Sequence, residues 1–134
     1  MTWMNVVAML VWTASGAVTL FILMCIDSLF TKYKDLAEMK KGNVAVATRF
    51  AMKLFAQGYI LSQSILKSND LWQALLASVI SFFILVLLQY VVQFMLQRLA
   101  DFDLDEGTLQ GKIAYALVGG SLHVVGALIL AACL

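Results

Sequence analysis

Residues 39–51, MKKGNVAVATRFA, decide how this chain is organised. A charged run is followed there by a Gly-Asn pair, and then by a segment that is apolar and rich in small residues. A similar order returns 65 positions later at residues 104–116, LDEGTLQGKIAYA, where a Gly-Thr pair follows the charged run. A long apolar segment precedes each stretch. The pattern therefore predicts one two-helix unit that is present twice.

The composition indicates a protein that dissolves in lipid. Of 134 residues, 63% are hydrophobic and 13% are charged, whereas soluble domains average roughly 45–50% apolar and about 25% charged residues. The apolar residues occur in blocks long enough to cross a bilayer, which takes about 20 residues. We therefore expect an integral membrane protein, folded as a single domain over residues 1–134.

The apolar blocks predict an all-α membrane protein with four transmembrane helices, arranged as two tandem helical hairpins. The first repeat covers about residues 5–66 and the second about residues 71–134. The charged segment after the first helix keeps apolar residues at helical spacing, including Tyr33 and Leu36, so this helix is expected to continue past the membrane as an amphipathic extension. The four expected spans are residues 6–26, 43–66, 71–97 and 112–134.

Each repeat is expected to turn at its Gly-Asn or Gly-Thr pair. Gly42 suits a left-handed helix C-cap, and Asn43 suits the N-cap of the next helix. In the second repeat, Gly107 and Thr108 are predicted to form the equivalent corner, after an acidic turn at residues 101–106. Both corners are expected to be tight bends at the membrane surface.

The distribution of basic residues predicts the orientation. Lysine and arginine concentrate in the two corner segments, while the N-terminus has none and the middle link has only Lys67. Basic loops stay in the cytoplasm, so both corners are predicted to be cytoplasmic and both termini periplasmic. The two repeats then run in parallel, related by an axis along the membrane normal. The basic residues used are Lys32, Lys34, Lys40, Lys41, Arg98 and Lys112.

This pattern resembles the YjfL-like family of small bacterial inner-membrane proteins. The matching pieces are KGNVAVA at residues 41–47, EGT at residues 106–108 and the ending AAC at residues 131–133. The resemblance covers essentially the whole chain and implies a duplicated two-helix domain of unknown function. Members are often encoded beside proteins of membrane-stress response or membrane maintenance. The resemblance implies no known catalytic residues.

Three polar residues of the second expected helix share one face. Arg49, Lys53 and Gln57 follow each other at intervals of four. A basic group at the centre of a bilayer costs roughly 2.5–3.5 kcal/mol on insertion scales, so this stripe needs an explanation. Three interpretations remain open: the side chains snorkel to lipid headgroups, they form a polar seam against another helix or subunit, or they line an anion-attracting path.

His123 is the single histidine of the chain. We expect it to pack against a neighbouring helix through one hydrogen bond, with a ligand or proton-relay role as the alternative. No further ligands are spaced to form a haem or metal site with it, so no cofactor and no metal are expected. The acidic residues at 101–106 lack the spacing of a calcium loop and are expected to form a solvated turn.

Small residues form stripes on the second and fourth expected helices. Such stripes let helices approach closely in lipid. They predict central packing of these two helices and a homo-oligomer. The residues are Ala47, Ala51, Gly58, Ala116, Gly119, Gly120 and Gly126.

The sequence contains no nucleophile–histidine–carboxylate set, no phosphate-binding glycine loop and no zinc-type cysteine pair. We therefore expect a non-enzymatic scaffold with a cytoplasmic protein partner at residues 27–43 and 98–112. The resemblance to the YjfL-like family implies that this scaffold lies in the inner membrane and acts in envelope maintenance or membrane stress. The alternative is a homo-oligomeric channel or small-solute conductor. With a net charge of +1, no nucleic acid partner is expected.

Overall fold

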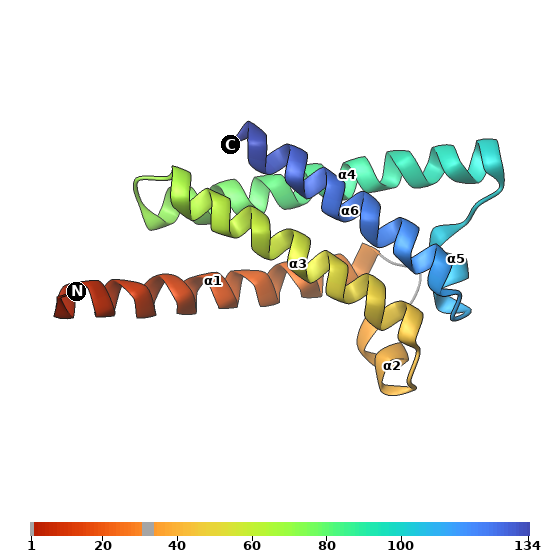
Figure 1. Cartoon of the computed structure of the whole chain (residues 1–134), viewed down its shortest axis with the longest axis horizontal. Coiled ribbons are helices and arrows are strands. Elements are labelled where there is room, and N and C mark those ends of the chain that lie inside the picture. Colours follow the sequence, from red (N-terminus) through yellow and green to blue (C-terminus); the bar gives the residue numbers. More distant parts are fainter. Residues whose placement is uncertain (1, 31–33) are drawn as a thin grey trace.

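The computed structural model describes residues 2–30 and 34–134, and this part of the chain is all helical. The predicted passage of the first helix through Lys32 and Tyr33 lies outside the described residues. Among the described residues, the first helix extends to Phe30, and the next helix begins at Asp35 after an extended Lys34. The helices (Figure 1) are α1 (Trp3–Phe30), α2 (Asp35–Lys40), α3 (Val44–Lys67), α4 (Leu71–Ala100), α5 (Leu104–Leu109) and α6 (Ile113–Cys133).

Three helices of the described chain are long and apolar enough to cross a membrane. They are α1 over Trp3–Leu29, α4 over its whole length and α6 over its whole length. The fold is therefore that of a helical membrane protein. The fourth long helix, α3, has 24 residues but is less apolar than the others.

Short polar side chains begin three of the helices. Asn43 accepts a hydrogen bond from the third residue beyond it at the start of α3, and Asp70 and Asp103 do the same for α4 and α5. Such caps satisfy backbone N–H groups that have no partner within the helix. The chain has no proline, and its long helices run without an interruption from that source.

Helix α3 lies at the centre of the bundle. It contacts each of the other helices, and its most extensive contact is with α6. The apolar core between them includes Ala56 and Ile60 of α3, Leu85 of α4 and Ala127 of α6. Each of these side chains is at most 3% exposed, so α3 is held on two sides by helices that are themselves long enough to span.

Helix α1 packs at the edge of the bundle (Figure 1). Its second half contacts α4 where Leu23 packs against Phe82 and Val86. Its first half is largely exposed, with Trp3 at 76% and Leu10 at 66%. In a membrane protein such an apolar surface is the one that lipid covers.

The first corner has the geometry that its sequence predicts, whereas the second lies elsewhere. Gly42 has a φ of +86°, in the left-handed region. Gly107 and Thr108, predicted as the second corner, instead lie buried inside α5. The left-handed glycine of the second repeat is Gly111, with a φ of +85°. The prediction was wrong because Asp103 starts a short helix within the acidic segment, and this moves the turn four residues further on.

The two corners meet at the same end of the bundle. Figure 1 shows α2 and α5 together at the end opposite the N-terminus and the α3–α4 link. The side-chain amide of Asn43 donates a hydrogen bond to the carbonyl oxygen of Leu109 at 2.9 Å. Two segments 66 residues apart in sequence are thus joined directly.

Candidate functional site

The polar stripe of α3 faces the inside of the bundle. Arg49 is 1% exposed, Lys53 4% and Gln57 2%. Side chains that snorkel keep their charged ends in contact with headgroups or water. This burial argues against snorkelling and favours a polar seam between helices. The polar seam here means Arg49, Lys53 and Gln57 together with the groups on other helices that they contact.

Arg49 joins α3 to α5. Its Nη1 lies 2.6 Å from Oδ1 of Asp105, and both side chains are buried. The guanidinium also passes close to the backbone of α6, because a Cβ added at Gly119 would lie 2.9 Å from its Nε. The glycine therefore provides the space through which the arginine reaches its carboxylate.

Lys53 joins α3 to α1. Its Nζ lies 3.0 Å from Oδ2 of Asp27, and the two side chains are 4% and 5% exposed. Asp27 follows the uncharged run of α1, four residues after Leu23 of the apolar contact with α4. The ion pair thus holds α1 against α3 near the end of the half of α1 that packs on the bundle.

Two further polar contacts of α3 reach α4 and α6. Gln57 donates to the carbonyl oxygen of Ser78 on α4 at 3.4 Å. Lys67, at the end of α3, donates to the carbonyl oxygen of Ala131 on α6 at 2.8 Å. The polar groups of α3 are therefore bonded to α1, α4, α5 and α6 in turn.

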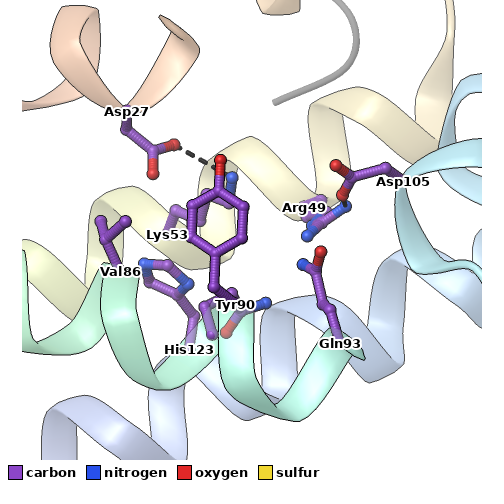
Figure 2. A pocket seen from close by; sticks show the side chains of 9 residues that line it. Asp27, Arg49, Lys53, Val86, Tyr90, Gln93, Asp105 and His123 are labelled. Atoms are coloured by element: carbon purple, nitrogen blue, oxygen red, sulfur yellow. Dashed lines mark hydrogen bonds and ion pairs between the residues drawn. The ribbon is translucent and has the colours of Figure 1, made fainter. Parts of the chain in front are cut away.

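A small cavity of about 20 Å³ lies among these groups. Figure 2 shows Asp27, Lys53, Arg49 and Asp105 around it, with His123 entering from α6. This volume holds about one water molecule. His123 is 3% exposed and its Nδ1 has no hydrogen-bond partner in the described chain. It lies beside the seam, and the single hydrogen bond expected for it is not formed by this atom.

Three carboxylates of this region were not predicted as site residues. Asp27 and Asp105 pair with the stripe, and Asp105, expected in a solvated turn, is only 5% exposed. Asp35 of α2 is also buried, at 3%. Burial raises the pKa of Asp35 above its ordinary value of 3.8, while the charge of Lys53 opposes that rise. The sequence offered a signal for Asp27 alone, because this carboxylate directly follows the uncharged run of α1.

The predicted small-residue stripes divide into two groups. On α6, Ala116, Gly119, Gly120 and Gly126 are all buried, and side chains of α3 or α4 lie against each of these glycines. The predicted positions on α3 pack less closely. Ala47 is half-buried and Ala51 is exposed. At Gly58, an added Cβ would meet nothing within 4 Å.

The described residues contain no cluster of three or more histidine, cysteine, aspartate or glutamate side chains that could hold a metal ion. The arrangement instead pairs each buried base with one acid on another helix. Fold and seam together define a helical membrane protein whose central helix is bonded through its charged and polar groups to the helices around it.

The chain belongs to the family described as Domain of Unknown Function (DUF350), which matches residues 1–134. This agrees with the resemblance to the YjfL-like family. No curated protein and no solved structure matches the chain.

Proposed function

We propose that this chain is a non-enzymatic, multi-pass scaffold of the bacterial inner membrane that acts in envelope maintenance or membrane stress. The observation that supports this most is that the polar side chains of the α3 stripe have partners within the chain. Arg49, Lys53 and Gln57 each bond to a different helix of the same chain. Side chains that are bonded in this way stabilise the packing of the helices, and they are not available to line an open conduction path.

In this proposal α3 is the fourth span. Its 24 residues extend about 36 Å at 1.5 Å per residue, which is enough to cross the hydrocarbon core. The cost of its two central bases is reduced because each is paired with a carboxylate inside the bundle. The chain then consists of two parallel hairpins, residues 5–66 and 71–134, whose corners lie at one end.

The end that carries α2 and α5 is proposed to face the cytoplasm. Its exposed basic residues include Lys34, Lys40 and Lys41 on the first repeat and Lys112 on the second, and basic segments stay on the cytoplasmic side. Both termini are then periplasmic. The joined corners form a platform of two short helices, and this platform is the proposed docking surface for a protein partner.

Site-specific photocrosslinking in living cells tests this platform. A photoreactive amino acid placed at Lys41 or Gln110, both exposed on the corners, should give one discrete adduct with another protein. The same probe at Asn69 or Trp72, exposed at the opposite end, is the matched control and should not give that adduct. Absence of a discrete adduct from the corner positions would contradict the docking role.

A homo-oligomeric conductor is the second candidate, and the cavity is the observation that favours it. Ionisable groups inside a membrane bundle commonly mark ion or proton pathways, and Asp27, Lys53 and His123 line one small space. Ion flux into proteoliposomes discriminates the two proposals. Flux that Lys53→Leu abolishes while the variant remains folded supports conduction, and the absence of flux from the folded original protein supports the scaffold.

The proposed homo-oligomer would use the face of α3 that the bundle leaves open. Ala51 is exposed and Gly58 has free space above it, so a neighbouring helix can approach closely there. Native mass measurement in mild detergent tests this assembly. A particle of one chain under conditions that preserve the fold would contradict it.

A further inference from the structure

A groove of about 860 Å³ opens between α1, α2 and α3. Its walls are mainly apolar, with Leu36 and Ala37 contributed by α2 and Phe50 by α3. Along α1 it extends from Phe21 to Leu29, which is about 12 Å of helix. Because α1 is one of the helices able to span a membrane, lipid acyl chains can reach this apolar trough.

Positive charge is placed at one end of the groove. Lys34 and Lys40 both line it and both are exposed. They belong to the segment that follows α1, where the chain leaves the apolar span. Asp35 also belongs to the lining, but its side chain is 3% exposed and its charge interacts with Lys53 and Asp27. The accessible charge at the mouth of the groove is therefore basic.

We propose that this groove is a binding site for an anionic membrane phospholipid. One acyl chain lies along α1 against Phe21 and Phe50, and the headgroup phosphate lies between Lys34 and Lys40. An apolar trough with ammonium groups at its interfacial end matches the two parts of such a lipid. The inference is independent of the scaffold role, because it uses none of the seam residues.

Fluorescence quenching by brominated lipids tests the site directly. Trp3, Trp12 and Trp72 are replaced by phenylalanine, and Phe50→Trp then places a single indole in the groove. The protein is reconstituted with brominated phosphatidylglycerol or brominated phosphatidylcholine. We expect about a tenfold preference for the anionic lipid, because each lysine near the surface adds attraction to anionic headgroups.

Two double variants distinguish a specific lipid site from a general attraction of the protein's positive charge for anionic lipid. Lys34→Gln with Lys40→Gln should abolish the preference. Lys41→Gln with Arg98→Gln removes the same charge outside the groove lining and should preserve it. Equal loss in both double variants would show a general charge effect and overturn the proposal.

The single-tryptophan protein alone also tests whether the groove binds an anionic phospholipid, whether or not the double variants fold. Equal quenching by both lipids would mean that only unselective surrounding lipid reaches Phe50→Trp. Quenching by neither lipid would mean that protein, such as a second copy of this chain, covers the groove. Either result would overturn the phospholipid site.

Discussion

Asn43 bonds across the two corners: its Nδ2 donates to the carbonyl oxygen of Leu109 at 2.9 Å. Its Oδ1 accepts from the backbone N–H of Val46 at 3.3 Å and so caps α3. One amide side chain therefore starts the central helix and holds α5 against it. An amide is suited to this because it carries both a donor and an acceptor.

Asn43→Ser should remove only the bond to Leu109. Serine caps helices about as well as asparagine, but its shorter side chain cannot reach across the corner. The expected loss is about 1 kcal/mol for one part-buried hydrogen bond. Asn43→Ala should lose about 2 kcal/mol, because the cap is lost as well. Unfolding in mixed micelles measures both, and a serine variant as stable as the original protein would contradict the cross-corner bond.

The Lys53–Asp27 pair should show strong coupling. Lys53→Leu leaves the carboxylate of Asp27 buried without its base, and removing one partner of a buried pair costs roughly 3–5 kcal/mol. Replacing both residues by leucine should recover most of that loss, since two apolar groups of similar volume can substitute for a buried pair. A double-mutant cycle of thermal stability measures the coupling.

The matched control for this cycle is the pair Lys41 and Glu38 at the end of α2, 3.8 Å apart, in which the lysine side chain is 72% exposed and the glutamate side chain 18%. Exposed pairs contribute about 0–1 kcal/mol, so the same cycle should give little coupling there. If the Lys53–Asp27 cycle gave an equally small coupling free energy, the pair would not stabilise the packing of α1.

The sequence predicts the long helices well because that prediction rests on local pattern. Continuous apolar runs mark the spans, and Gly42 with Asn43 marks a corner by conformational preference alone. The second corner was misplaced for a local reason too: Gly107 resembles Gly42 in its neighbours, but Asp103 caps a helix that contains it. A glycine between a charged run and a small-residue helix does not by itself identify the turn.

The partners of the stripe could not be read from the sequence in the same way. Arg49 and Asp105 are 56 residues apart, and Lys53 and Asp27 are 26 apart. Their pairing depends on how the helices pack, which no local spacing records. The sequence does identify Arg49 and Lys53 as costly in lipid, and the structure adds which carboxylates reduce that cost.

Gly119→Ala should destabilise the protein, whereas Gly58→Ala should not. A methyl group at Gly119 would lie 2.9 Å from Nε of Arg49, so the buried guanidinium must shift, and overpacking of this kind costs about 1–3 kcal/mol. At Gly58 nothing lies within 4 Å, and alanine is favoured over glycine in a helix by up to about 1 kcal/mol. Thermal unfolding compares them, and equal effects at the two positions would contradict the role of Gly119 in placing Arg49.

Asp35 should give a pH dependence opposite to that of an ordinary salt-bridged carboxylate. Burial raises its pKa above 3.8, the largest effect, with Lys53 and Arg49 opposing and Asp27 adding to the rise. The folded state therefore favours the protonated acid, and stability falls as the pH rises from 3.8 through the raised pKa. Asp35→Asn should be more stable than the original protein near neutral pH and lose this advantage toward pH 3.8. An advantage that stays constant over this range in micelle unfolding would contradict a raised pKa.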